Sequence, residues 1–300
     1  MAQRFLKKDG RIFSGKISIL NEQQRVMSVL YVVATPIGNL EDITLRALRI
    51  LRDVGLIAAE DTRKTRRLLG VYGIKTPTTS YHEHNKRAKL DYLLDYLQEK
   101  DVALVSEAGM PGLSDPGYEL IVAAAQRGIS VVPIPGPSVV ITALVVSALP
   151  THQFTYVGFL PRKKGERIRL MESMASEPRT IIALESPHRL LPTLRDLSEV
   201  LGDRKIAIGR ELTKVHEEVF RGTISQALEH FQQPRGEFTL VVEGSKGVKK
   251  PVLTSEIEQG LRHLYYQGVT AKEAVARLSL TTGLSKRELY RAWLKLKSSE

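Results

Sequence analysis

Short apolar runs that alternate with helical segments constrain the fold of this chain most strongly. Runs of strand length occur at residues 30–37 (LYVVATPI), 56–61 (LIAAED), 102–106 (VALVS) and 129–135 (ISVVPIP). Helical patterns accompany them at residues 44–51, 62–70, 91–100, 118–126 and 138–149. Continuous apolar strands between helices are typical of a mostly parallel sheet that is covered on both faces. The pattern therefore predicts an α/β fold.

A second series of strands follows the first and indicates a second α/β domain. Its apolar runs lie at residues 154–160, 180–186, 205–212 and 238–244. The Lys/Gly stretch EGSKGVKKP then marks a boundary, and the pattern beyond it is purely helical. We predict domains at 28–150 and 151–246, plus a small all-α module at 252–300. Residues 1–27 are expected to be a disordered leader, with Met27 as an alternative start.

The composition narrows the functional classes. The 300 residues include no cysteine, which excludes disulfides, thiolate catalysis and cysteine-based zinc sites. No apolar run approaches the roughly 20 residues that span a bilayer, and the first residues, MAQRFLKKDG, do not resemble a secretory signal. We expect a cytoplasmic protein with no membrane partner.

The net charge of +11 is concentrated at the two ends of the chain. Residues 1–27 hold six Lys/Arg against two acidic residues, and residues 246–300 hold eleven against five. The body of the chain is nearly neutral. Basic ends indicate appended contacts to a phosphate backbone, although basic tails also serve solubility alone.

Three loops follow predicted strands, where open α/β sheets bind ligands. The first, TPIGNLED, has one glycine and is therefore no Rossmann fingerprint; the chain has no P-loop either. The second, SEAGMPGLSDPG at 106–117, is longer than a turn requires and carries Glu107 and Asp115, which favours a ligand loop. The third, PIPGPS, places Ser138 at a helix start, where it needs no role beyond capping.

Eight motifs in a fixed order resemble the tetrapyrrole methylase superfamily, and within it the class III S-adenosylmethionine methyltransferases that modify small-subunit ribosomal RNA. They extend over about residues 29–244 and read TPIGNL, AEDTRKTRRLL, SYHEHN, SEAGMPGLSDPG, IPGPS, ESPHRL, GREL-x-x-x-HEE and GEFTLVVEG. The resemblance implies two α/β domains with S-adenosyl-L-methionine in the cleft between them, and a homodimer. It also implies 2′-O-methylation of a cytidine ribose in the decoding region (P site) of 16S ribosomal RNA.

The resemblance also implies a set of cofactor-binding residues. These are Pro36, Gly38, Ser106, Ala108, Gly109, Pro111, Ser138, Leu184, Glu185, Ser186, Phe238 and Thr239. The tetrapyrrole enzymes have a Gly-Gly-Asp-Pro loop where this chain has residues 108–111. The aspartate of that loop is replaced here by Met110 or displaced to Glu107, which leaves the role of the acid open.

Methyl transfer to a ribose requires a base, because a hydroxyl group is a poor nucleophile. Acidic and histidine side chains near strand ends supply the candidates, which are Glu60, Asp61, His82, His84 and Glu107. We rank Glu107, Asp61 and His82 highest, although Asp61 alternatively caps a helix and His82 alternatively binds a backbone group. The two histidines beside Glu83 lack a third ligand at useful spacing, so we expect no metal.

Basic side chains at helical spacing are the candidates for RNA contact. Arg63, Arg66 and Arg67 share one face of a predicted helix, which is alternatively only a solvated face. Residues 161–169 form a second basic cluster. In the tail, capping boxes at Thr270 and Ser285 outline a helix-turn-helix. Its second helix has an apolar face of Leu289, Trp293 and Leu296 and a basic stripe of Arg287, Arg291 and Lys295.

Three functions are compatible with these patterns. The preferred one is a ribosomal RNA methyltransferase that acts on naked small-subunit RNA or on the assembled subunit. The alternative is methylation of a small tetrapyrrole or precorrin in the same cleft, which leaves the basic tail unexplained. A third is a ligand-sensing helix-turn-helix regulator, which leaves the long match to an enzyme family unexplained. The tail itself is alternatively a dimerisation or docking module.

Overall fold

The computed structural model describes residues 28–246, 253–282, 284 and 286–297. The predicted leader at 1–27, including Met27, lies outside this part. The chain divides into two compact units, with the boundary between Pro137 and Ser138. No helix among the described residues is both long and apolar enough to cross a membrane.

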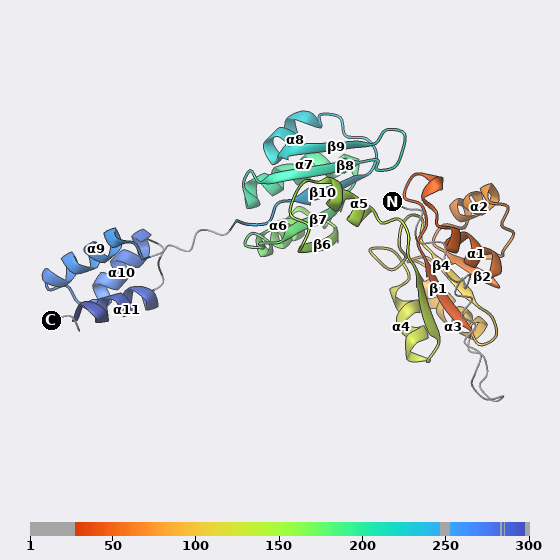
Figure 1. Cartoon of the computed structure of the whole chain (residues 1–300), viewed down its shortest axis with the longest axis horizontal. Helices are drawn as coiled ribbons and strands as arrows, with labels where there is room; N and C mark the ends of the chain where they lie inside the picture. The colour runs from red at the N-terminus through yellow and green to blue at the C-terminus, as the bar shows by residue number, and fades with distance from the viewer. Residues whose placement is uncertain (1–27, 247–252, 283, 285, 298–300) are drawn as a thin grey trace, which may run out of the picture. The chain divides into compact units, whose positions relative to one another are not determined.

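The first unit is built on a five-stranded parallel sheet with the order β3-β2-β4-β1-β5 (Figure 1). Its strands are β1 (Val29–Val33), β2 (Leu56–Ala59), β3 (Thr78–Ser80), β4 (Val102–Val105) and β5 (Ser130–Ile134). Its helices are α1 (Leu45–Asp53), α2 (Thr62–Val71), α3 (Lys86–Tyr96) and α4 (Tyr118–Gln126), together with the short 3-10 helix η1 (Leu40–Asp42).

Two apolar clusters cover the two faces of this sheet. Val33, Ile57 and Val105 pack with α1 and α2 in one cluster. Leu30 and Leu104, among others, pack with α3 and α4 in the other cluster. Neighbouring strand residues enter different clusters because side chains alternate along a strand. This arrangement confirms the predicted parallel sheet with both faces covered.

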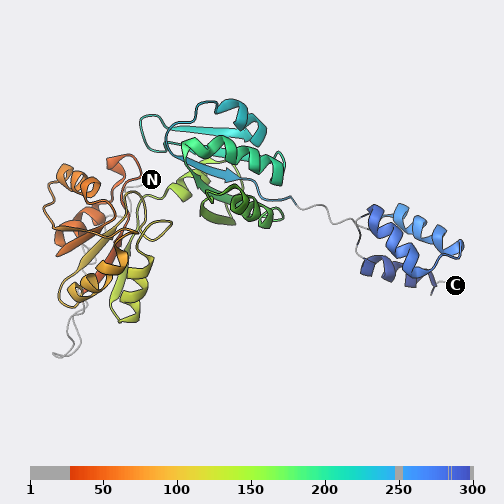
Figure 2. The same ribbon diagram turned by 180° about the vertical axis from the view of Figure 1, so that it is seen from behind.

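The second unit has a mixed sheet with the order β6-β7-β10-β8-β9, in which only β6 and β7 pair in parallel. Its strands are β6 (Phe154–Phe159), β7 (Thr180–Glu185), β8 (Lys205–Arg210), β9 (Glu218–Thr223) and β10 (Phe238–Val242). The view from behind in Figure 2 shows the helices against this sheet. They are α5 (Val139–Val146), α6 (Lys164–Ser173), α7 (Pro187–Leu201) and α8 (Ile224–His230).

The helix α5 belongs to the second unit. Its buried residues Val140, Ala143 and Leu144 pack with Ile182 of β7 and Val241 of β10. We predicted the boundary at residue 150 because α5 reads as the last helix of the first series. The structure divides the chain earlier, after Pro137, because the apolar face of α5 is buried on the second sheet.

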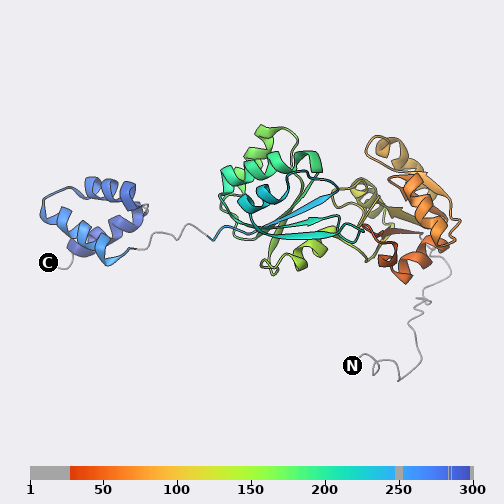
Figure 3. The ribbon, with the colours of Figure 1, turned by 90° about the horizontal axis from the view of Figure 1, so that it is seen from above.

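The C-terminal segment forms a small helical module with its own core (Figure 3). Its helices are α9 (Ser255–Tyr266), α10 (Ala271–Thr282) and α11 (Lys286–Lys297). The hydroxyl of Thr270 accepts a hydrogen bond from the Glu273 amide at 3.3 Å, which is one of the two bonds of the predicted capping box. The second capping residue, Ser285, lies outside the described residues. Leu289 and Trp293 are buried in the core, and Leu296 packs against it, as the spacing predicts.

Candidate functional site

The carboxyl ends of the parallel strands bring several predicted site residues to one edge of the first sheet. A pocket of about 420 Å³ lies there, which falls within the usual range for small-molecule sites. Its walls come from the turn after β1, the helix α2 and the loop after β4. The lining residues are Thr35, Pro36, Gly38, Leu40, Lys64, Thr65, Arg67, Leu68, Ser106 and Glu107.

The turn after β1 is joined to the loop after β4. Thr35 and Gly109 exchange two backbone hydrogen bonds, at 2.9 and 3.0 Å. Gly109 has φ +77°, a left-handed conformation that glycine adopts without strain. Pro36, Gly38 and Ser106, three of the proposed cofactor-binding residues, line this pocket. Of the other predicted residues in this loop, Ala108 is exposed, whereas Gly109 and Pro111 are buried.

Asp61 has a structural function at the start of α2. Its carboxylate accepts hydrogen bonds from the backbone amides of Arg63 and Lys64, at 2.8 and 3.3 Å. It also forms an ion pair with the Arg63 side chain at 3.3 Å. These hydrogen bonds, the Arg63 side chain first, lower the pKa of Asp61. A low pKa makes a weak base, so the structure favours the capping role.

The remaining acidic side chains at this edge form a cluster. Glu107 is ion-paired with Lys64 of α2. The Glu60 carboxylate accepts a hydrogen bond from the Glu107 amide at 3.0 Å. Burial raises the pKa of Glu60, and Lys64 opposes that rise. Burial also raises the pKa of Asp115 to about 6, with the negative charge of Glu60 as the second cause.

His82 follows β3 and lies beside this cluster. Its amide donates to the Asn85 side chain at 2.8 Å, and its ring meets that of His84 edge-on at 6.0 Å. The Nδ1 atom of His82 is buried and has no hydrogen-bond partner in the described part of the chain. Of the three predicted bases, His82 and Glu107 thus remain at the site, and Asp61 serves the helix.

Sequence reasoning gave the Glu60–Asp115 pair no special rank. Glu60 was one of five candidate bases, and Asp115 was noted only as a loop carboxylate. Glu60 and Asp115 differ from the other acidic residues in their surroundings, which depend on side chains that three different strands bring together. The only indication in the sequence was that each of the two residues lies in a segment that follows an apolar strand.

The three arginines predicted to share one helix face have different surroundings. Arg63 pairs with Asp61, and the guanidinium of Arg66 donates to the Thr78 hydroxyl at 3.1 Å. Arg67 lines the pocket together with Lys64. Arg67 is therefore the one of the three that is placed to meet a ligand in this pocket.

The second unit brings the other predicted cofactor residues side by side. Leu184 pairs with Thr239, and Glu185 pairs with Phe238, across the antiparallel strands β7 and β10. Glu185, Phe238 and Thr239 are buried, whereas Leu184 and Ser186 are partly exposed. Ser138 is the N-cap residue of α5, as the sequence predicts, but its side chain makes no capping hydrogen bond.

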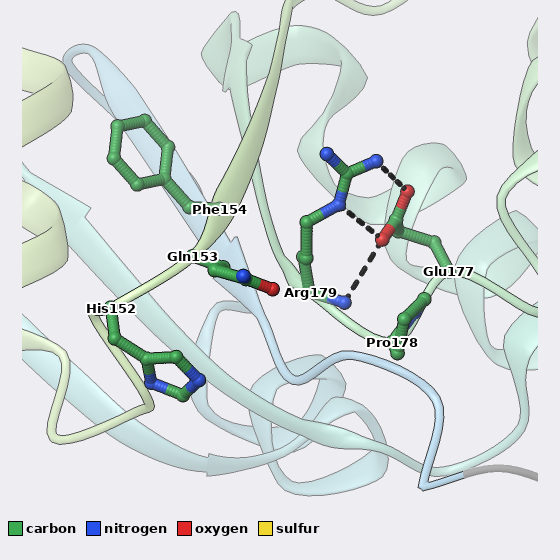
Figure 4. Close-up of a pocket in the computed structure, with 6 residues that line it drawn as sticks. All are labelled: His152, Gln153, Phe154, Glu177, Pro178 and Arg179. Carbon is green, nitrogen blue, oxygen red and sulfur yellow. Dashed lines mark hydrogen bonds and ion pairs between the residues drawn. The ribbon is translucent and has the colours of Figure 1, made fainter.

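A second pocket lies at the amino-terminal ends of strands β6 and β7 (Figure 4). Its residues are His152, Gln153, Phe154, Glu177, Pro178 and Arg179. Two hydrogen bonds of 2.7 Å join the Arg179 guanidinium to the Glu177 carboxylate. The Arg179 side chain, first of several causes, lowers the pKa of Glu177 to about 2. The charge of the arginine is thus neutralised locally, and we assign no ligand to this pocket.

The basic stripe of the C-terminal module lies on α11. Arg291 and Lys295 are exposed, and the partly exposed Tyr290 and Leu294 are their neighbours along the helix. Arg287 belongs to the same helix, but its side chain lies outside the described part. No group of three or more potential metal-ligand side chains lies together among the described residues.

Comparison with known proteins gives the strongest information on function. A family model described as Tetrapyrrole (Corrin/Porphyrin) Methylases matches residues 29–228. The chain is 46% identical over 276 residues to "Ribosomal RNA small subunit methyltransferase I" of Halalkalibacterium halodurans, covering 90% of this chain and 96% of the relative. It is 47% identical to the protein of the same description from Synechocystis, covering 91% and 99%.

Solved structures agree on the fold. A uroporphyrin III C-methyltransferase from Thermus thermophilus has a TM-score of 0.53 at 18% identity, covering 72% of this chain and 97% of that one. A diphthine synthase has a TM-score of 0.57 at 14% identity, covering 72% and 90%. At such identities the likeness concerns the fold alone. The family match covers the whole first sheet and the second sheet up to β9, and it agrees with relatives that align over nine-tenths of the chain. This chain therefore belongs to the tetrapyrrole methylase family.

Proposed function

We propose that this chain is an S-adenosylmethionine-dependent methyltransferase that methylates the ribose 2′-oxygen of a cytidine in the decoding region (P site) of small-subunit ribosomal RNA. The observation that carries this proposal is the 46–47% identity to ribosomal RNA small subunit methyltransferases I over nine-tenths of the chain. The likeness to a uroporphyrin methyltransferase does not favour a tetrapyrrole substrate, because at 18% identity it concerns only the fold.

The pocket at the first sheet suits a compact ligand approached closely by the backbone. The bonded pair Thr35–Gly109 fixes the wall of the pocket, and Pro36 and Gly38 complete it. When bound, S-adenosylmethionine supplies an electrophilic methyl group. We propose that these residues orient the cofactor together with Ser106, Ala108 and Pro111. In the second unit, we propose that the cofactor is bound by Ser138, the Leu184–Ser186 segment and the adjacent Phe238–Thr239 segment.

The basic groups near this pocket suit a polyanionic substrate. Arg67 lines the pocket, and we propose that it binds a phosphate next to the target ribose. Lys64 is ion-paired with Glu107, which holds the loop after β4 against α2. Arg63 and Arg66 contribute charge at the surrounding surface. Phosphate contacts of this kind position an RNA without reading its sequence.

We further propose that α11 contacts RNA through Arg287, Arg291 and Lys295. Exposed basic side chains with an adjacent aromatic, here Tyr290, are typical of surfaces that bind single-stranded nucleic acid. Changing all three residues to Gln is expected to weaken binding to the small subunit. The slope of log affinity against log salt should become shallower by about 0.7–0.9 for each lost phosphate contact. Lys272→Gln on α10 is the matched control, and an unchanged slope in the triple variant would contradict this role.

We also propose that the protein acts as a homodimer in the cytoplasm. On α5, Ile141 and Val145 are 48% and 64% exposed, and Phe159 of β6 is 57% exposed. Large apolar side chains at a surface are typical of a region covered by a partner. Sedimentation should give a dimer for the wild type, and a smaller dimer fraction for the double variant Ile141→Glu, Val145→Glu. A wild-type monomer at micromolar concentration would contradict the dimer.

The proposed reaction is tested by label transfer. Methyl-labelled S-adenosylmethionine is incubated with assembled small subunits that lack the modification, and the labelled nucleoside is then mapped. We expect a single 2′-O-methylcytidine. An unlabelled RNA, despite tight cofactor binding, would contradict the proposal and favour a small-molecule substrate. Naked RNA assayed in parallel distinguishes the two forms of the substrate.

A further inference from the structure

The connection between β6 and α6 carries three consecutive basic side chains. They are Arg162, Lys163 and Lys164, and all three are exposed. Lys163 pairs with Glu166 at 3.2 Å and Lys164 with Asp196 at 3.6 Å, yet the two lysine side chains remain 82% and 69% exposed. The guanidinium of Arg162 forms no ion pair or hydrogen bond within the part of the chain that the structure describes. Because exposed ion pairs are weak, the loop presents positive charge to the solvent.

Two other guanidinium groups hold the backbone of this loop. Arg167 of α6 is buried, and its Nη1 atom donates to the carbonyls of Pro161 and Arg162, both at 3.3 Å. The Nη1 atom of Arg189, from α7, donates to the carbonyl of Leu160 at 2.9 Å. Side chains from two helices thus fix three consecutive carbonyls. The exposed basic side chains therefore extend from a backbone that is already in place.

The buried partner of Arg167 is Asp196 of α7. The Nε atom of Arg167 donates to the Asp196 carboxylate at 2.8 Å, and only 5–6% of either side chain is exposed. Removing two charges from water is costly, so a buried pair is weak evidence for a gain in stability. Here it aims the remaining donor of the guanidinium fork at the loop carbonyls. The pair thus fixes the loop after β6 against α7.

The loop lies at the same edge of the second sheet as several proposed cofactor residues. The strands β6 and β7 are parallel, and Phe159 at the end of β6 pairs with Leu184. Arg189, which holds the loop, also forms an ion pair with Glu185 at 2.6 Å and donates to the Ser186 hydroxyl at 3.0 Å. One guanidinium therefore connects the basic loop with the segment after β7 that we propose to bind the cofactor.

We propose that the loop at residues 160–164 binds backbone phosphates of the ribosomal RNA and holds the RNA at this edge of the second sheet. This inference rests on the proposed function. Arg162 is the main contact, because its guanidinium has no partner among the described residues and matches a phosphate through two hydrogen bonds. Lys163 adds positive charge beside it. A loop that is already in place loses less conformational entropy when it binds.

Arg162→Gln tests the phosphate contact. Its affinity for the small subunit is expected to fall about tenfold, as for the loss of one charge-assisted hydrogen bond. The slope of log affinity against log salt should become shallower by about 0.7–0.9, the contribution of one phosphate. Lys205→Gln is the matched control, because Lys205 is exposed and begins β8 at the opposite edge of the same sheet. It should keep the wild-type affinity and slope.

Single-turnover methyl transfer separates binding from chemistry. At saturating small subunits, Arg162→Gln should transfer the methyl group at about the wild-type rate. Below saturation its rate should fall in proportion to the lost affinity, because a phosphate contact stabilises the bound substrate and the transition state equally. A lower rate at saturation, with unchanged affinity for the subunit, would place Arg162 in the chemical step and contradict the inference.

Arg167→Lys tests whether the loop is held in advance. This variant keeps every exposed charge and the positive charge beside Asp196, but lysine lacks the fork that reaches the loop carbonyls. Affinity for the subunit should fall by about 2–10-fold, as for the ordering of one side chain or more on binding, while the salt slope stays that of the wild type. Wild-type affinity would overturn the preformed loop. Arg162→Gln changes only an exposed side chain, so the phosphate contact remains testable if Arg167→Lys does not fold.

The outcomes separate this inference from the proposed function. If the wild type does not label ribosomal RNA, the function itself is wrong. If the wild type labels RNA and Arg162→Gln matches Lys205→Gln in affinity and salt slope, only the phosphate contact is overturned. A loss of affinity for S-adenosylmethionine in Arg162→Gln, with unchanged binding of the subunit, would equally overturn it and assign the loop to the cofactor.

Discussion

Both α/β units place a glutamate at the carboxyl end of a strand, in contrasting surroundings. In the second unit, the Glu185 side chain is fully buried and forms an ion pair with Arg189 at 2.6 Å. It also accepts hydrogen bonds from the Thr193 hydroxyl at 2.7 Å and from the Ser186 amide at 2.8 Å. In the first unit, the half-buried Glu60 accepts one backbone hydrogen bond and has Asp115 as a neighbour.

This difference in hydrogen-bond and ion-pair partners distinguishes acidic groups that stabilise the fold from acidic groups that could accept or donate a proton. A buried charge with all its partners rigidifies its surroundings, whereas a poorly compensated one has a displaced pKa, a feature that is frequent at functional sites. Asp196 of α7 belongs to the first kind, since its carboxylate is buried against Arg167 of α6. Asp115 belongs to the second kind. Substituting Asn for Asp at each position tests the distinction directly.

The largest effect on stability is expected for Asp196→Asn. Only 5–6% of the side chains of Asp196 and Arg167 is exposed, so this variant leaves a buried guanidinium without its counter-charge. We expect the free energy of unfolding to fall by about 3–5 kcal/mol, as for other broken buried pairs. Urea denaturation measures it. Adding Arg167→Met should restore part of the loss, and a loss below about 1 kcal/mol in the single variant would contradict a structural role.

Asp115→Asn should change the free energy of unfolding in the opposite direction, toward greater stability. The folded state raises the pKa of Asp115 from 3.8 to about 6, so the folded protein binds more protons than the unfolded chain between these values. The stability of the folded wild-type protein therefore falls as the pH rises from about 4 to about 6. At pH 8 the variant should be more stable by about 1 kcal/mol, a value discounted for the solvent that reaches this group. The gain in stability should vanish below about pH 4. A variant that is less stable than the wild type at pH 8 would show that the Asp115 carboxylate is not buried without compensation.

The smallest effect is expected for Asp61→Ala. This variant removes the cap of α2 and the hydrogen bonds to the amides of Arg63 and Lys64. The melting temperature should fall by a few degrees, as for other lost caps. The single-turnover methyl-transfer rate should remain close to that of the wild type. A collapse of this rate in a protein that still binds the cofactor would return Asp61 to the list of bases.

Much of the fold was predictable because strongly apolar strands leave a clear pattern. Most or all residues are buried in five strands, and all five strands were expected. They are β1, β2, β4, β7 and β10. Two strands were missed. The short β3, TTS, has no apolar residue, and β9, EVFRGT, is only partly buried. Both lie at sheet edges, where burial on two faces is not required.

The candidate site was predictable in position and not in detail. Residues after the strands were correctly expected to gather at one edge, because parallel strands end there together. The separation of Arg67 from Arg63 and Arg66 was not predictable, since it depends on Asp61 and on Thr78 of a missed strand. The pairing of Lys64 with Glu107 connects two distant segments. Helical spacing carries no information on such contacts.

The most direct test of the contrast between the two units is the ionisation of Asp115 itself. Carbon-13 labelling of aspartate carboxyl groups in the full chain, with Asp115→Asn for assignment, gives its titration by NMR. We predict a midpoint of about 6 in the wild type and a lower midpoint in Glu60→Gln. A midpoint near the ordinary aspartate value of about 4 in both proteins would mean that Asp115 is as well compensated as other acids, and would contradict the account.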